Sequence, residues 1–261
     1  EVDVDAISDG KNVFVAGIMQ HIEEAGIHSG DSACSLPPVS IKSFLIKEIE
    51  NQTRKLALAL KVKGFMNVQY AIKNDKIYVI EVNPRASRTV PFVSKAKNLP
   101  LAKIASRVMA GEKLTKFDLK SKTKNMFAVK EAVFPFNKFP NSDLLLGPEM
   151  KSTGEVMGFD KNFGMAFAKS QIAASNSLPK KGLAFISLKN SHKEEGVKLA
   201  KQLVKLNFKL CGTSGTADYI NQHGIKCKKI NKVNQGSPHI VDVLNAKKIA
   251  LVINTGGGNS E

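Results

Sequence analysis

The sequence predicts an α/β protein in two parts: an α+β part with an antiparallel sheet, followed by a Rossmann-like part with a parallel sheet. Two hairpin patterns support the first part, residues 1–18 with a turn at Asp9-Gly10 and residues 65–82 with a turn at Asn74-Asp75. After residue 182, short apolar runs alternate with helical patterns, as in parallel strands joined by helices, and this alternation predicts the second part.

The length and one polar stretch predict the domain boundary. A chain of 261 residues suits one large domain or two ordinary domains that each bury a core. Residues 176–182 have the composition of a linker, so we expect one domain over residues 1–174 and a second over residues 175–261. Because the chain begins without Met and ends just after an apolar strand, we expect a fragment cut at both ends, with the second domain truncated at its carboxyl end.

The other elements follow from the spacing of apolar residues. Residues 40–63 carry apolar side chains at helical intervals among charges, which predicts an amphipathic helix that ends at Gly64. A second helix is predicted over residues 93–111, with Gly111 at its carboxyl end. Further along we expect a strand at 127–134, a loop-rich region at 135–164, a helix at 163–174, strands at 183–188, 208–211, 225–230 and 249–254, and helices at 193–206, 216–223 and 239–245.

Composition argues against several classes of protein. The formal charge is +16, but the lysines are dispersed, Trp is absent and Tyr numbers three, so the sequence predicts no nucleic-acid partner. No apolar run approaches the length of a membrane span, and no signal peptide opens the chain, so no membrane association is predicted. Cys34, Cys211 and Cys227 are widely spaced, which argues against a disulfide framework or a cysteine zinc site and favours the cytoplasm.

The most informative stretch is the end of the strand predicted at residues 77–82. Residues two apart on a strand share a face, so Glu81 and Asn83 should point one way while Ile80 and Val82 point the other. A carboxylate beside a neutral oxygen suits a hard divalent cation that bridges to phosphates. A polar strand end that only faces water is the competing interpretation.

Arginine usage favours a site over that alternative. Only four of the 39 cationic residues are Arg, and two of them, Arg85 and Arg88, directly follow the strand end. Guanidinium groups hold phosphate oxygens with two parallel hydrogen bonds, which a lysine cannot do. The pattern therefore indicates a phosphate site at the strand end.

The position of Gln69 depends on the hairpin turn. If the loop takes three residues, Gln69 lies across from Glu81 on the same face and adds a third oxygen ligand or an orienting amide. A two-residue turn would place Val68 there instead. The sequence leaves both registers open.

The polar loop at residues 17–32 is the second candidate for ligand contact. It holds His21, His28, three acids and three glycines, but no pair of histidines has the helical spacing of a zinc site. Glycines allow the backbone to approach a ligand closely, so we expect the loop to contact a ligand through its carbonyls and side chains.

Two loops of the second domain should lie at the carboxyl edge of its sheet. Residues 212–216 join a strand to a helix, and residues 254–258 follow the last strand. Hydroxyls and free backbone N–H groups at such an edge suit a phosphate, although ordinary turns remain an alternative for either loop alone. The sequence contains neither a dinucleotide-binding fingerprint nor a P-loop.

With these residues in hand, the whole chain resembles the C-terminal part of the carbamoyl-phosphate synthase large-subunit family. The resemblance is carried by residues 1–5, 28–37, 80–95 and 134–140. It implies the carboxyl-terminal portion of an ATP-grasp domain, which phosphorylates carbamate, followed by a regulatory domain of methylglyoxal-synthase-like (MGS-like) fold. It also implies ammonia-using, ATP-dependent synthesis of carbamoyl phosphate for arginine and pyrimidine biosynthesis.

The same resemblance implies roles for individual residues of the ATP-grasp part. Arg85, Arg88 and Asn83 would be catalytic, and Mg²⁺ or Mn²⁺ would be held by Gln69, Glu81 and Asn83. ATP would also contact Glu1, Ile27, His28 and Ser29. K⁺ would be held by a loop that comprises Glu1, His21, Glu23, Ile27 and Ser32.

Regulatory sites and partners are implied in the same way. Ornithine would be held by Glu23, Asp31 and Glu131. A nucleotide monophosphate would be held by Ser187, Lys193, Thr213, Thr216, Lys232, Asn254 and Thr255, with Gly256 where the family pattern has a second Thr. The full enzyme would pair with a glutaminase small subunit and form an oligomer of such heterodimers, and the fragment alone would be inactive.

Two alternatives stay open from the residues. Another ATP-grasp ligase would share the strand end with its acid and amide but would lack the attached regulatory sheet. A nucleotide-sensing module without catalysis would use the first domain only as a scaffold.

Overall fold

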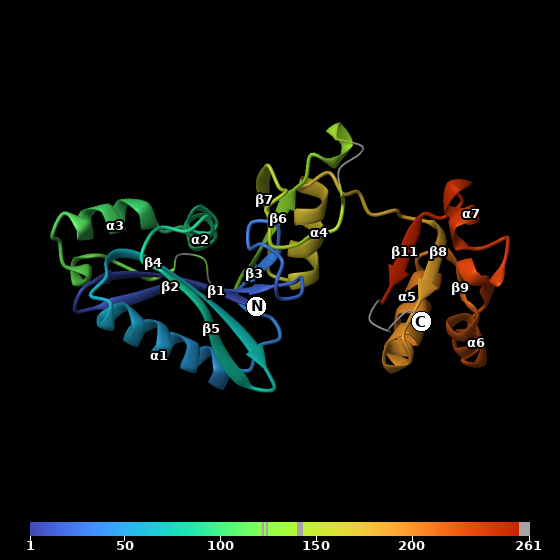
Figure 1. Ribbon diagram of the computed structural model, residues 1–261, viewed down its shortest axis with the longest axis horizontal. Helices are drawn as coiled ribbons and strands as arrows, with labels where there is room; N and C mark the ends of the chain where they lie inside the picture. Colours follow the sequence, from blue (N-terminus) through green and yellow to red (C-terminus); the bar gives the residue numbers. More distant parts are fainter. Residues whose placement is uncertain (122, 124, 140–142, 256–261) are drawn as a thin grey trace. The chain divides into compact units, whose positions relative to one another are not determined.

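A seven-stranded antiparallel sheet is the frame of the first unit of the chain (Figure 1). The computed structural model describes residues 1–121, 123, 125–139 and 143–255, and the chain divides into units Glu1–Asn176 and Ser177–Glu261. The strand order in the first unit is β5-β4-β1-β2-β3-β6-β7. The strands are β1 (Val2–Asp9), β2 (Val13–His21), β3 (Cys34–Leu36), β4 (Lys63–Lys73), β5 (Lys76–Asn83), β6 (Phe127–Val133) and β7 (Gly154–Asp160).

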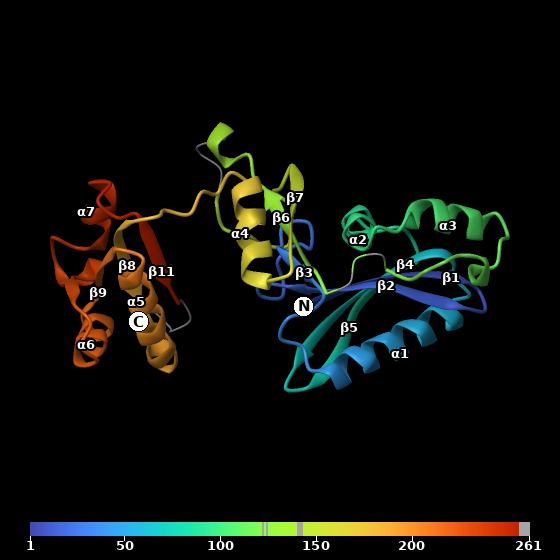
Figure 2. The same cartoon turned by 180° about the vertical axis from the view of Figure 1, so that it is seen from behind.

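Helices cover both faces of this sheet, as Figures 1 and 2 show from opposite sides. Helix α1 (Ser43–Ala59) buries Ile49 and Ala57 with Val2, Val4 and other apolar residues of β1 and β4. Helices α2 (Val90–Lys97) and α3 (Leu101–Met109) pack on the opposite face. Because side chains alternate along β1, its valines enter the α1 core while Asp3 and Asp5 point to the face of α2.

The far end of the sheet carries its own helix. Helix α4 (Phe163–Ala173) packs against β6 and β7. A side chain at Gly158 of β7 would collide with the α4 backbone at Ala166, so glycine permits the close approach of helix and strand.

Several element predictions for this unit were wrong in detail. The helix predicted over residues 93–111 is two helices, because Asn98 adopts a left-handed conformation (φ 51°) and Pro100 follows it. The helix predicted over residues 40–63 ends at Ala59. Lys61 then takes φ 53°, and β4 begins at Lys63. Strands β3 and β7 were missed, since both are stabilised by sheet neighbours in segments whose own sequence favours loops.

The second unit has the predicted parallel sheet, in the order β10-β9-β8-β11. The core of this unit packs apolar strand residues against two helices. The helices contribute Val197, Ala200, Ala217 and Ile220. The strands are β8 (Gly182–Ser187), β9 (Phe208–Thr213), β10 (Cys227–Ile230) and β11 (Leu251–Asn254), and the helices are α5 (Lys193–Lys205), α6 (Ser214–Gln222) and α7 (Ile240–Asn245). Short 3₁₀ turns add Leu114–Lys116, Phe136–Lys138, Asn190–His192 and Val233–Gln235. Among the described helices, none combines the length and apolar character that a bilayer crossing requires.

Candidate functional site

A cleft of about 700 Å³ opens on the face of the first unit's sheet that carries Asp3. It gathers every residue that was predicted to contact the nucleotide, the divalent metal or the transferred phosphoryl group. These are Glu1, Ile27, His28, Ser29, Gln69, Glu81, Asn83, Arg85 and Arg88. Sequence reasoning missed other lining residues, including Asp3, Asn67, Ser87, Thr89, Lys130, Met150 and Glu155.

A β-bulge places Gln69 opposite Glu81. The β4–β5 turn has two residues, Asn74 and Asp75, both at positive φ, so the expectation that a three-residue loop would be needed was wrong. The register then shifts between Gln69 and Tyr70, because β5 contributes the extra residue Ile80. Without that bulge, Val68 would face Glu81.

The bulge also sets the side chains of the strand end. Asn83 donates a hydrogen bond from Nδ2 to Glu81 Oε1 at 2.8 Å, which confirms that these two side chains share a face. Val82 packs into the α1 core, whereas Ile80 is half-exposed and lines the cleft, contrary to the expectation that Ile80 would share the face of Val82. Gln69, Glu81 and Asn83 therefore present one carboxylate and two amides to the same space.

The two arginines lie on the exposed segment between β5 and α2. Arg85 donates to the carbonyl of Ala86 at 3.1 Å, and the Arg88 guanidinium contacts Met150 Sδ. Neither guanidinium is paired with a carboxylate among the described residues, so both keep donors for an anion in the cleft.

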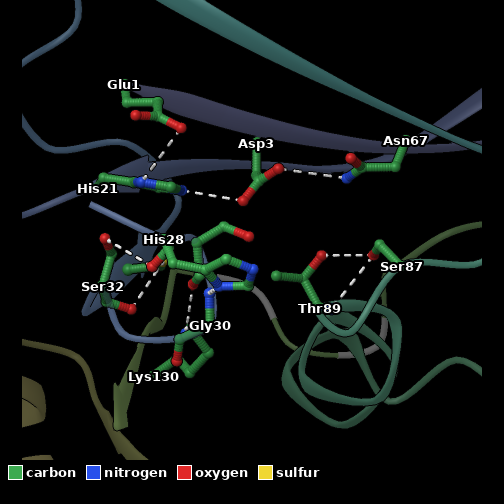
Figure 3. A network of polar contacts seen from close by, with 12 residues as sticks. Glu1, Asp3, His21, His28, Gly30, Ser32, Asn67, Ser87, Thr89 and Lys130 are labelled. Atoms are coloured by element: carbon green, nitrogen blue, oxygen red, sulfur yellow. Dashed lines mark hydrogen bonds and ion pairs between the residues drawn. The ribbon is translucent and has the colours of Figure 1, made fainter. Parts of the chain in front are cut away.

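A row of buried polar side chains lies along one side of the cleft (Figure 3). His21 Nε2 is 2.9 Å from Asp3 Oδ2, and Asn67 Nδ2 donates to Asp3 at 3.3 Å and to Asp5 at 3.0 Å. Burial alone would lower the pKa of His21, but the hydrogen bond with Asp3, the contact with Cys34 and the charges of both groups together raise the pKa to about 10. The acid-apolar alternation of β1 was the sequence signal for this row.

A buried lysine binds the backbone of the loop that carries His28. Lys130 of β6 is 1% exposed and donates from Nζ to the carbonyls of Ser29 and Gly30 at 3.0 and 3.4 Å. Gly30 N donates to His28 Nδ1 at 3.0 Å, which closes a tight turn. The sequence signal for this contact was a lysine, beside Glu131, within the otherwise apolar run at residues 127–134.

The five residues predicted to hold K⁺ lie around the start of β1 and the loop after β2. Glu1 Oε1 is 4.0 Å from His21 Nδ1, and Glu23 accepts the Ala33 N–H at 2.6 Å. The Ser32 hydroxyl donates to the His28 carbonyl at 3.4 Å. Because the His21 ring is protonated at neutral pH, only its backbone carbonyl could serve a cation.

The three acids predicted to hold ornithine are all buried or nearly so. Asp31 already accepts the backbone N–H groups of Lys151 and Ser152 at 2.8 and 2.9 Å. Burial first, and then the nearby Glu23, raises the pKa of Glu131 to about 7. Burial likewise raises the pKa of Glu23. Two adjacent acids with raised pKa values favour a cationic neighbour.

In the second unit, most of the predicted effector residues meet at the carboxyl ends of the strands. The Thr213 hydroxyl lies 3.5 Å from Ser187 Oγ and 3.3 Å from Thr216 Oγ1. Thr216 and Thr255 accept the backbone N–H groups of Leu188 and Lys189, both at 3.0 Å. Asn254 ends β11, Lys193 starts α5, and Lys232 is exposed after β10. Gly256, Gly257 and Gly258 lie outside the described residues.

Comparison with known proteins identifies both units. Residues 1–117 match the family model described as the carbamoyl-phosphate synthase L chain, ATP binding domain, and residues 195–261 match the MGS-like domain. The chain is 50% identical over its whole length to the carbamoyl phosphate synthase large chain, C-terminal section, of Aquifex aeolicus. The chain belongs to the carbamoyl phosphate synthase large-chain family. It is therefore a member of an ATP-binding ligase family of ATP-grasp type.

Other relatives show how much of the enzyme this chain represents. It is 56% identical over 99% of its length to the carbamoyl phosphate synthase large chain of Methanobrevibacter smithii. It spans 52% of the Aquifex relative but only 24% of the Methanobrevibacter one. A solved L-amino acid ligase from Bacillus licheniformis shares the fold at a TM-score of 0.51 and 13% identity, over 67% of this chain and 52% of that one.

Proposed function

We propose that the first unit forms the carboxyl-terminal part of the site at which a carbamoyl phosphate synthase phosphorylates carbamate with ATP. The observation that carries the proposal is the convergence in one cleft of Gln69, Glu81 and Asn83 with the Arg85–Arg88 segment. Because this unit runs directly into the MGS-like unit, it corresponds to the carbamate-phosphorylating half of the resemblance. The product would serve arginine and pyrimidine biosynthesis.

The residues fit a divalent cation of the Mg²⁺ or Mn²⁺ type. A carboxylate and two amide oxygens on one sheet face are hard ligands that leave room for water and phosphate oxygens. No group of three or more His, Cys, Asp or Glu in the described part of the chain could hold a metal ion. When bound, the cation would neutralise the phosphate charge that develops during transfer.

The remaining cleft residues would position the reactants. Arg85 and Arg88 would hold the transferred phosphoryl group and the carbamate, since no carboxylate of the described residues pairs with either guanidinium. Glu1, Ile27, His28 and Ser29 would contact the nucleotide. Lys130 would keep the His28–Gly30 turn in place by binding its carbonyls.

Regulation and assembly complete the proposal. A nucleotide monophosphate would bind the hydroxyl cluster of the second unit, ornithine the acids Glu23, Asp31 and Glu131, and K⁺ the loop after β2. The full enzyme would work in the cytoplasm with a glutaminase small subunit, as an oligomer of heterodimers. The present chain would be inactive alone because it spans only part of its relatives' length.

Phosphoryl transfer from carbamoyl phosphate to ADP, the reverse of the proposed step, tests the site in the complete enzyme. Glu81→Gln should lower this rate by about 100-fold or more, because the only carboxylate among the three proposed metal ligands is lost. Glu112→Gln is the matched control, since Glu112 pairs with Arg107 on the surface. Retention of the rate in Glu81→Gln would exclude the proposed metal site.

A further inference from the structure

The segment that carries the two arginines leaves β5 at Asn83 and is bound again to the sheet by side-chain hydrogen bonds to Asp5. Arg85, Ala86 and Arg88 are exposed, whereas Thr89 is buried and Ser87 partly so. Among the described residues, the hydrogen bonds that join residues 86–89 to the sheet all end on Asp5. Figure 3 shows Ser87 and Thr89 turned toward each other beside the polar row of β1.

Asp5 is built to hold that segment. Its Oδ1 accepts the Ser87 hydroxyl at 2.7 Å and Asn67 Nδ2 at 3.0 Å, and its Oδ2 accepts the Thr89 hydroxyl at 2.6 Å. The Asp5 side chain is 1% exposed, so these partners replace the water that it loses. Asn67 also donates to Asp3, which fixes the amide from a second side.

We propose that Asp5 is a positioning residue that sets Arg85 and Arg88 over the cleft by holding Ser87 and Thr89. The catalytic part of this inference rests on the proposed function of the arginines. Asp5 does not line the cleft, and it acts through two hydroxyls at the point where the segment enters α2. Because Asp5 keeps the segment ordered before substrate binds, no conformational entropy has to be lost to order it during phosphoryl transfer.

Amide hydrogen exchange of the present chain tests the structural half. Thr89→Val removes the hydroxyl bound to Asp5, and Thr53→Val is a matched control that removes an equally buried hydroxyl bound to Tyr70 at 2.8 Å on the α1 side of the sheet. Thr89→Val should speed exchange of the hydrogen-bonded amides of residues 85 and 89, relative to their intrinsic rates, by about 10-fold, the effect of one lost buried hydrogen bond. Equal exchange of this segment in both variants would overturn the inference.

Kinetics of the complete enzyme test the catalytic half. Asp5→Asn and Thr89→Val should lower kcat for phosphoryl transfer by about 10- to 100-fold with little change in KM for the nucleotide, because a misplaced catalytic group costs rate. Thr89→Ser should restore kcat, and Thr53→Val should keep it.

The two proposals fail in different ways. If Glu81→Gln abolishes transfer while Thr89→Val and Asp5→Asn keep the full kcat, Asp5 has no positioning role. If exchange of the amides of residues 85 and 89 rises as expected while Glu81→Gln retains activity, Asp5 does hold the segment and the proposed function of the cleft is wrong.

Discussion

The two polar sites of this chain are built in opposite ways. The cleft of the first unit gathers charged side chains from strand faces and loops, and its support is a buried row of hydrogen-bonded titratable side chains that includes His21, Asp3 and Asp5. The site of the second unit is a cluster of neutral hydroxyls at strand ends, which contact one another and the backbone. The proposed phosphoryl-transfer site thus depends on charge and register, whereas the proposed anion site of the second unit depends on strand-end topology.

Replacing the two arginines should give the largest effect on the rate of phosphoryl transfer. If the rate did not fall, the contrast between a charge-based cleft and a hydroxyl cluster would not hold. Arg85→Lys and Arg88→Lys together should lower phosphoryl transfer in the complete enzyme by about 1,000-fold, because an ammonium cannot form the two parallel bonds of a guanidinium. Arg107→Lys is the matched control, since Arg107 makes a two-bond pair with Glu112 away from the cleft. Rates in the double variant within a factor of two of the control would remove the arginines from catalysis.

The second-largest effect is expected in how the free energy of unfolding depends on pH, because the first site contains the His21–Asp3 pair and the second is a cluster of hydroxyls. The pKa of His21 is raised from 6.5 to about 10, so the stability from its charged form is complete below pH 6.5 and is lost as the pH rises through about 10. His21→Asn should flatten the alkaline fall of the urea unfolding curve and cost roughly 3 kcal/mol at neutral pH, the typical loss when a buried ion pair is broken.

The control for this measurement is an exposed histidine. His223→Asn removes an exposed ring of the second unit that contacts only its own helix, through the Tyr219 carbonyl and ring, and it should leave the alkaline fall in place. An identical alkaline fall in His21→Asn and in the unaltered chain would show that the His21–Asp3 pair is not the source.

The smallest effect is expected at the hydroxyl cluster. Thr213→Val removes the hydroxyl that lies between Ser187 and Thr216, and it should weaken the binding of a nucleoside monophosphate by about 10-fold, as one lost hydrogen bond to a charged ligand would. Isothermal titration with the chain measures the change, and Thr53→Val supplies the control. Unchanged affinity in Thr213→Val would place the effector elsewhere.

The two sites depend on strand register to different degrees, and so did their predictions. In a parallel sheet, the carboxyl ends of neighbouring strands lie at one edge whatever the detailed register, so the pattern of alternation was sufficient to place the loop at residues 212–216 there. In the antiparallel sheet, one residue of register decides which side chain faces the cleft. The bulge at Ile80 that brings Gln69 opposite Glu81 is set by tertiary pairing and has no distinct sequence signal.

The sequence also failed to predict which buried residue supports the arginine segment. The identity of Glu81, Asn83, Arg85 and Arg88 followed from residue type and spacing, but the role of Asp5 did not. Asp5 and Thr89 are 84 positions apart, and only the packing of α2 onto β1 brings them together. Non-local contacts of this kind cannot be read from local periodicity.

The position of a bound divalent cation tests the central claim most directly. Crystals of the complete enzyme with Mn²⁺ and a non-hydrolysable ATP analogue would locate the metal through its anomalous scattering. The account predicts a peak within about 2.0 to 2.4 Å of oxygens of Glu81 and of at least one of Gln69 and Asn83, with Arg85 and Arg88 on the terminal phosphate. A metal peak in the cleft that contacts none of these three side chains would contradict it.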